Sequence, residues 1–245
     1  MYTDDIKRFK EMVSECNKIV FFGGAGVSTE SGVKDFRSED GIYKTVTKYK
    51  ISPETILSRS FFLQNPKVYY DFHYNFFLKD EVEPNKAHKA LSRLEKDGKL
   101  SAVITQNIDG LHQAAGSKNV IELHGTVLKN YCTKCKADFS AEDIKELKGE
   151  VPYCKECGGL VRPGIVLYEE PLDNDTTVAA VKAISDADML IIGGTSLAVY
   201  PAAAYINYFN GKYSVLINRD ETPFDNKADL VFREKIGTVL SDLIG

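Results

Sequence analysis

Short apolar runs alternate with amphipathic stretches along most of the chain. Runs such as "IVFF", "AVIT", "MLII" and "SVLI" contain no charged residue, and each precedes a polar or glycine-rich segment. The stretches between them, such as "AHKALSRLEK" and "TTVAAVKAIS", repeat apolar residues at spacings of three and four, as amphipathic helices do. Strands without polar alternation are buried on both faces, and helices between them are typical of a parallel sheet. The pattern therefore predicts an α/β fold, a parallel sheet with helices on both faces.

The same pattern predicts where individual elements lie. A first helix is expected over 3–16, where Cys16 continues a helical repeat of apolar residues and is therefore a core residue. Further helices are expected over 87–98, 175–187, 200–211 and 236–244, and strands over 18–24, 101–107, 119–125, 164–168, 188–194, 213–218 and 228–232.

Two internal stretches depart from this alternation. Residues 38–80 are rich in Tyr and Phe, and residues 126–162 contain four of the five cysteines. We predict that they form a helical module and a zinc-binding module, which together make a smaller lobe. The large domain would then comprise residues 1–37, 81–125 and 163–245.

The ends of the predicted strands carry polar or glycine-rich segments. These segments read "GGAGVS", "TQNID", "LHG", "GGTS" and "NRD". Parallel sheets bind ligands at the carboxyl ends of their strands, so these segments are expected to converge on one site.

A glycine-rich loop follows the first strand. Gly24, Ala25 and Gly26 are small enough for backbone amides to approach a pyrophosphate, but Thr29 stands where the dinucleotide fingerprint has Gly or Ala. No Gly-Lys-Ser/Thr follows, so the loop is not an ATP-binding P-loop. A tight turn without a ligand stays an alternative. The neighbouring "KDFR" favours a ligand, because it offers an Arg for phosphate and a Phe to cover a ring.

Four cysteines form two Cys-x-x-Cys pairs with eighteen residues between them. This spacing is that of a four-thiolate zinc ribbon, in which four sulfurs leave no open position on the metal. The predicted zinc is therefore structural, and redox pairs are the alternative. The predicted ligands are Cys132, Cys135, Cys154 and Cys157.

Charge and hydropathy bear on the partners. The net charge of −4 does not favour direct nucleic-acid binding, which wants a basic face. The uncharged stretch 189–206 is interrupted by "GGTS" and Pro201, so we expect no membrane partner. The polar, acidic start "MYTDDIKRFK" lacks a secretory signal, and clustered cysteines suit metal binding; both favour a cytoplasmic protein.

Polar side chains at two strand ends can do chemistry. Gln106, Asn107 and Asp109 follow one strand and can hold ribose hydroxyls or a carboxamide, while His124 ends another and can accept a proton near neutral pH. Position alone leaves open whether His124 is a base or a buried core histidine. For His73, His88 and His112 we expect core or helix positions.

Taken together, these segments resemble the sirtuin family of NAD-dependent protein-lysine deacylases. The resemblance rests on "GAGVSTESGVKDFR", "TQNIDGLHQAAG", "ELHG", the cysteine quartet, "GGLVRPGIV", "GGTSLAVYPAA" and "INRDETPFD", which occur in the family's order over nearly the whole chain. It implies that the large domain is a Rossmann-like NAD-binding domain, and that NAD, as co-substrate, and an acyl-lysine protein or peptide meet between the two lobes.

The resemblance also implies roles for single residues. His124 would be the general base, with Asn107 and Asp109 acting beside it at the nicotinamide. Val166, Leu167 and Tyr168 would bind the substrate backbone as an added strand. The cofactor would be bound by Gly24, Ala25, Gly26, Thr29, Asp35, Phe36, Arg37, Gln106, Ile108, Gly194, Thr195, Ser196, Asn218 and Arg219.

The implied reaction consumes NAD. Nicotinamide leaves its ribose, the acyl-lysine oxygen attacks the exposed carbon, and His124 activates a ribose hydroxyl, which attacks the resulting imidate. Water completes the transfer, giving free lysine, nicotinamide and O-acyl-ADP-ribose. Three alternatives stay open: mono-ADP-ribosyl transfer to protein, a dehydrogenase, which Thr29 disfavours, and a non-enzymatic NAD-sensing module.

The chain departs from the family pattern in three places. Its cofactor loop reads "VKDFRS" where the family has Ile-Pro-Asp-Phe-Arg-Gly, which changes the stiffness of the loop. Glu169 replaces a family glycine in the substrate segment and adds negative charge, from which we expect a preference for basic peptides. The aromatic stretch 68–80 contains no Arg, unlike the Tyr-x-x-Arg of desuccinylating members, so acetyl or another uncharged acyl group is predicted.

Overall fold

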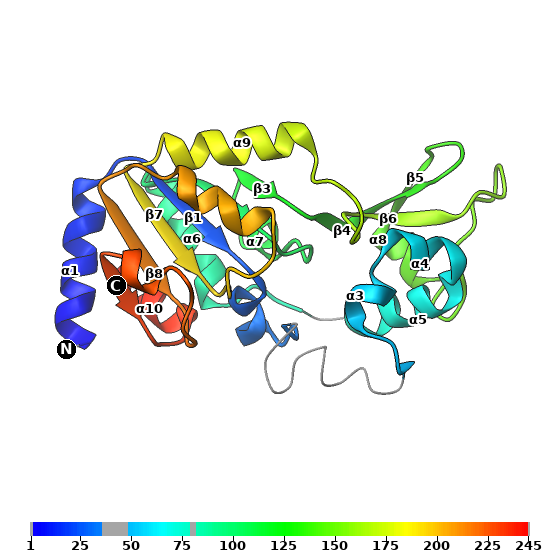
Figure 1. The fold of residues 1–245 in the computed structure, drawn as a ribbon, viewed down its shortest axis with the longest axis horizontal. Coiled ribbons are helices and arrows are strands. Elements are labelled where there is room, and N and C mark those ends of the chain that lie inside the picture. Colours follow the sequence, from blue (N-terminus) through cyan, green and yellow to red (C-terminus); the bar gives the residue numbers. More distant parts are fainter. Residues whose placement is uncertain (1, 36–48, 79–81, 245) are drawn as a thin grey trace.

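A parallel sheet forms the larger half of the molecule. The computed structural model describes residues 2–35, 49–78 and 82–244 (Figure 1). Within these residues, one sheet has the strand order β3–β2–β1–β7–β8–β9, the order of a doubly wound dinucleotide-binding sheet. Its strands are β1 (Ile19–Gly23), β2 (Leu100–Thr105), β3 (Val120–Glu122), β7 (Met189–Gly193), β8 (Tyr213–Ile217) and β9 (Leu230–Phe232), and all their pairings are parallel.

Alternate residues of each strand enter two different apolar cores. In β1, Ile19 and Phe21 pack into one core, and Val20 and Phe22 pack into the other. Cys16 belongs to the first core, as predicted. Helices therefore cover both faces, as the continuous apolar strands predicted. The first face carries α1 (Tyr2–Glu15), α6 (Lys86–Lys96) and α10 (Ile236–Ile244), and the second carries α9 (Asn174–Ser185) and the 3-10 helix η4 (Ala202–Tyr208).

A second lobe lies at the other end of the molecule (Figure 1). It contains the antiparallel sheet β5–β4–β6 and a group of short helices, and residues of both sequence insertions share one apolar core. Tyr70 Oη donates to the carbonyl oxygen of Val161 at 2.6 Å and so joins the helices to the sheet. The residue boundaries of the two domains stay a prediction. The elements are α3 (Pro53–Ile56), α4 (Arg59–Gln64), α5 (Pro66–Phe76), β4 (Gly125–Cys132), β5 (Asp138–Ser140), α8 (Ala141–Lys145) and β6 (Val161–Ile165).

Three predicted elements differ from the observed ones. The strand expected over 164–168 ends at Ile165, because the next residues hydrogen-bond to loops rather than to a strand of the sheet. The strand expected over 119–125 stops at Glu122, after which the chain crosses into β4 of the other sheet. The helix expected over 200–211 is the 3-10 helix η4, which begins after Pro201.

Candidate active site and metal centre

Two glycine loops meet at the switch point of the sheet, between β1 and β7, where the strand order reverses. β1 leads into the 3-10 helices η1 (Ala25–Val27) and η2 (Thr29–Ser31), and its neighbour β7 leads into Gly194. The amide of Gly26 donates to the carbonyl oxygen of Gly194 at 2.8 Å. A Cβ on Gly26 would lie 2.8 Å from Gly194 Cα, and Gly194 itself has φ +59°. Glycine is therefore required here by the packing of one loop on the other, which shapes the wall above the sheet.

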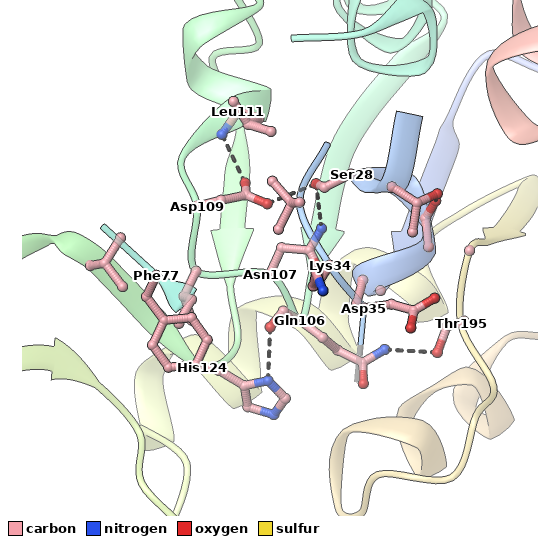
Figure 2. Close-up of a pocket in the computed structure, with 18 of the residues that line it drawn as sticks. Ser28, Lys34, Asp35, Phe77, Gln106, Asn107, Asp109, Leu111, His124 and Thr195 are labelled. Atoms are coloured by element: carbon pink, nitrogen blue, oxygen red, sulfur yellow. Dashed lines mark hydrogen bonds between the residues drawn. The ribbon is translucent and has the colours of Figure 1, made fainter. Parts of the chain in front are cut away.

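A buried hydroxyl ties the first loop to the loop after β2. Ser28 Oγ donates to Asp109 Oδ2 at 2.7 Å and accepts from Asn107 Nδ2 at 3.0 Å (Figure 2). Asp109 Oδ1 accepts the amide of Leu111, the first residue of α7 (Leu111–Ala114), at 2.9 Å. Burial raises the pKa of Asp109. The side chains of Asn107 and Asp109 are thus oriented before any ligand binds.

His88 also contacts Ser28, from the first turn of α6. Its Nδ1 accepts the backbone N–H of Asn85 at 3.3 Å, so in the neutral ring the proton is on Nε2, which lies 3.5 Å from Ser28 Oγ. Burial lowers the pKa of His88 to about 4, so the ring is neutral at pH 7. Ser28 then uses its one proton and both lone pairs, and its rotamer is fixed.

His124 lies at the junction of the two sheets. Its Nδ1 is 2.9 Å from the carbonyl oxygen of Gln106, which can only accept, so Nδ1 carries a hydrogen in either protonation state (Figure 2). Burial lowers the pKa of His124 below its ordinary 6.5, so the ring is neutral at pH 7. Within residues 2–35, 49–78 and 82–244, Nε2 has no hydrogen-bond partner. The lone pair of Nε2 is therefore available to take a proton.

One cavity of about 990 Å³ brings these groups together. Gln106 links its two sides, because Nε2 donates to Thr195 Oγ1 at 3.1 Å. Leu57, Phe76 and Phe77 supply an apolar part of the wall, and Figure 2 shows Phe77 on the same side of the pocket as His124. Every described residue assigned to catalysis, cofactor or substrate lines the cavity: Gly24, Ala25, Gly26, Thr29, Asp35, Gln106, Asn107, Ile108, Asp109, His124, Val166, Leu167, Tyr168, Gly194, Thr195, Ser196, Asn218 and Arg219.

The segment after β6 is held on both of its edges. The amide of Val166 donates to the carbonyl oxygen of His124 at 2.9 Å, and the amide of Tyr168 donates to that of Leu57 at 3.0 Å. Between them, the amide of Leu167 donates to Glu170 Oε2 at 2.9 Å. These three N–H groups are thus already bonded within the chain, which limits how a peptide strand can pair with this segment.

The four paired cysteines form a compact cluster outside this cavity. Their sulfur atoms all lie within 4.8 Å of one another, with Cys132 and Cys157 3.4 Å apart and Cys135 and Cys154 3.7 Å apart. Four sulfurs about 2.3 Å from one zinc ion would be about 3.8 Å apart. A Cβ on Gly159 would lie 2.6 Å from Cys132 Sγ, so glycine leaves room for the sulfurs. The cluster is compatible with a structural zinc site.

Backbone amides prepare one of these sulfurs to bind a cation. The N–H groups of Lys134 and Cys135 point at Cys132 Sγ at 3.4 and 3.5 Å. These hydrogen bonds, that of the Cys135 N–H first, lower the pKa of Cys132. Zinc binds the thiolate, so this environment favours the form that a metal requires.

Comparison with known proteins identifies the family. The Sir2 family model matches residues 24–201. The chain belongs to the Sir2 family.

The Sir2 relatives are similar over their full length. A protein named NAD-dependent protein deacetylase from Clostridium perfringens is 54% identical over 242 residues, covering 98% of this chain and 99% of that relative. One of the same name from Clostridium tetani is 52% identical over 241 residues, with 98% of each chain covered. A solved Sir2 structure described with a deacetylated p53 peptide and 3′-O-acetyl ADP ribose has a TM-score of 0.90 and 39% identity, and the match covers 98% of this chain and 97% of that one.

The site of this Sir2 chain includes residues that the sequence does not predict, and two predicted residues lie outside the described part of the chain. Phe36 and Arg37, assigned to the cofactor, lie outside the described residues. The sequence does not predict a role for Ser28, although it stands in the glycine loop, because a serine there indicates nothing until its hydrogen-bond partners are known. His73, His88 and His112 are buried as expected, but His88 also supports Ser28. In the described part of the chain, no helix combines the length and apolarity needed to span a membrane.

Proposed function

We propose that this chain removes acetyl groups from lysine side chains of proteins, consuming NAD and yielding nicotinamide and O-acetyl-ADP-ribose. The names of its close relatives and the ligands of the solved Sir2 structure support this assignment. The observation that carries it in this chain is the fixed tautomer of His124, whose Nε2 has no hydrogen-bond partner among the described residues and lines the same cavity as the glycine loop. A dinucleotide-binding loop in the same cavity as a basic nitrogen suits a reaction that transfers a glycosyl group and a proton.

The residues divide the chemistry between the two ends of the cavity. NAD, when bound, supplies an activated bond from its ribose to nicotinamide, and an acyl oxygen can replace nicotinamide there. Asn107 and Asp109, oriented by Ser28, hold the nicotinamide end. His124 Nε2 then takes the proton of a ribose hydroxyl, while Nδ1–H keeps its hydrogen bond to Gln106 and orients the ring.

Binding roles follow the two lobes. Val166, Leu167 and Tyr168 bind the backbone of the acyl-lysine peptide at the edge of the smaller lobe. The described residues of the larger domain that bind NAD are Gly24, Ala25, Gly26, Thr29, Asp35, Gln106, Ile108, Gly194, Thr195, Ser196, Asn218 and Arg219.

The acyl group is uncharged. Phe76, Phe77 and Leu57 line the same cavity as His124, and a carboxylate placed against these apolar side chains would lose hydration. We further place the protein in the cytoplasm, where the reducing environment keeps the four metal-binding thiols free of disulfides.

Nicotinamide release tests this function. We expect the native protein to release nicotinamide from NAD when an acetyl-lysine peptide is present and to release little with a succinyl-lysine peptide. His124→Ala removes the base, so deacetylation should fall by about 10²–10⁴-fold. The measurement is chromatography of nicotinamide and of the acyl-ADP-ribose product.

Other results would assign other functions. Release without peptide, together with labelled protein, would indicate ADP-ribosyl transfer. NAD binding with no release under any condition would leave an NAD-sensing module. Equal rates on acetyl and succinyl peptides would contradict the uncharged acyl pocket.

A further inference from the structure

Glu169 has an unusual backbone conformation beside the cavity. Its φ is +76°, in the left-handed region that residues with a side chain rarely adopt. That conformation costs about 1–2 kcal/mol for an L-residue, so surrounding contacts must hold it. Such outliers cluster where a ligand is bound.

The side chain of Glu169 supplies those contacts. Oε2 accepts the backbone N–H of Ser60 at 2.9 Å, and Oε1 accepts Ser60 Oγ at 2.8 Å. Ser60 is the second residue of α4, where backbone N–H groups have no partner within the helix. The carboxylate therefore joins the segment after β6 to the first turn of α4. We call this pair of hydrogen bonds the Glu169–Ser60 clamp.

Neighbouring contacts make the clamp part of a rigid mount. The carbonyl oxygen of Tyr168 accepts the amide of Arg59 at 3.0 Å, and residues 58 and 168 form a parallel β-bridge. On the other side, Glu170 accepts two hydrogen bonds from Arg162, at 2.6 and 2.9 Å. The segment is thus fixed from α4 at one edge and from β6 at the other.

The clamp lies where the cavity opens to the surface. Tyr168 and Glu169 line both the main cavity and a shallow groove of about 410 Å³, whose other walls include Glu54, Ser60 and Phe61. We expect the peptide residues on either side of a bound acyl-lysine to leave the cavity along this surface. Both carboxylate oxygens of Glu169 accept hydrogen bonds from Ser60, so the side chain fixes the segment by hydrogen bonding as well as adding a negative charge.

We propose that Glu169 is a positioning residue for the acyl-lysine peptide, an inference that rests on the proposed deacetylase function. The clamp holds residues 166–169 in one conformation before the peptide arrives. Without it, that conformation is populated for a smaller fraction of the time, and the apparent affinity for peptide falls by that fraction. Binding of NAD depends on the glycine loops of the other lobe and is unaffected.

Three variants separate the effect of the clamp's hydrogen bonds on peptide binding from the effect of the Glu169 charge. Glu169→Gly keeps the left-handed backbone without strain but removes both hydrogen bonds, so peptide Kd and KM should rise by about tenfold with kcat and the KM for NAD unchanged. Glu169→Gln keeps an acceptor of the same shape without charge and should bind peptide within about twofold of native. Ser60→Ala loses one of the two bonds and should lie between them.

Binding and turnover are measured separately. Fluorescence anisotropy of a labelled acetyl-lysine peptide gives Kd without any chemistry, and amide hydrogen exchange at Ser60 reports the clamp itself. Unchanged peptide affinity in Glu169→Gly, with Ser60 exchange accelerated, would overturn the proposal. Weakened binding of Glu169→Gln equal to that of Glu169→Gly would assign the effect to charge instead. A native protein that binds the peptide but does not deacetylate it would contradict the proposed function and leave the Kd comparison valid.

Discussion

The cavity edge and the cysteine cluster hold their functional groups in different ways. At the cavity edge, Ser28, His88, Asn107 and Asp109 come from separate loops and helices and satisfy one another by hydrogen bonds. In the cysteine cluster, two short hairpin-like turns within residues 132–157 place four sulfurs around one point. The first arrangement depends on the register of the whole sheet. The second depends on a single ion, and the two should fail separately.

Removing zinc should have the largest effect. Structural zinc contributes on the order of 10 kcal/mol to the folding of a small module, and the cluster lies in the core shared by the smaller lobe. Chelation, or Cys132→Ser, should therefore unfold that lobe and abolish deacetylation, because Leu167 belongs to the same core. Limited proteolysis should cut within 126–162 while the parallel sheet stays protected.

Cys16 supplies the matched control for this experiment. It is fully buried in the core of the larger domain and is not one of the clustered cysteines. Cys16→Ala should leave the zinc content at one per chain and the smaller lobe resistant to protease. A native protein that is active when purified without zinc would contradict the claim that the cysteine cluster depends on a metal ion.

Removing one hydroxyl should have the next largest effect, this time on the cavity edge. Ser28→Ala leaves Asp109 Oδ2 without its donor and Asn107 Nδ2 without its acceptor, at a cost of about 1–3 kcal/mol. We expect kcat for nicotinamide release to fall by about tenfold or more, and the zinc content to stay unchanged. Steady-state kinetics of nicotinamide release and metal analysis of the same sample check both statements.

Ser31→Ala is the control from the same loop. The hydroxyl of Ser31 is buried and has no hydrogen-bond partner among the described residues. Its removal should be neutral or slightly stabilising and should leave kcat unchanged. If Ser31→Ala and Ser28→Ala behave alike, the damage comes from the loop as a whole and not from the group centred on Ser28.

The two regions also differ in how well the sequence predicts them. The zinc cluster needs only the spacing of four cysteines, which is local. The convergence of the strand ends needs only the rule that parallel strands end at one edge, and all of the described residues predicted for catalysis, cofactor and substrate line one cavity. Their roles stay predictions.

What the sequence could not supply is contact between distant segments. Ser28 meets Asp109 only because of the register between β1 and β2, and His88 reaches it only from the first turn of α6. The end of β6 at Ile165 depends on loops at 57 and 124 competing for the following amides. The clamp at Glu169 likewise depends on where α4 begins.

The smallest effect expected is a shift in the acid limb of the pH profile. The base must be neutral, and burial lowers the pKa of His124 below 6.5, so kcat/KM should persist until the pH falls through this lowered value. Burial gives His73 a pKa of about 3, His112 about 3 and His88 about 4, so these rings are neutral at pH 7 and gain a proton only far below it. Asp109 is the competing group, because burial raises its pKa. An acid limb that survives in Asp109→Asn belongs to His124. An acid limb that disappears in Asp109→Asn would show that protonation of Asp109, and not of His124, limits kcat/KM at low pH.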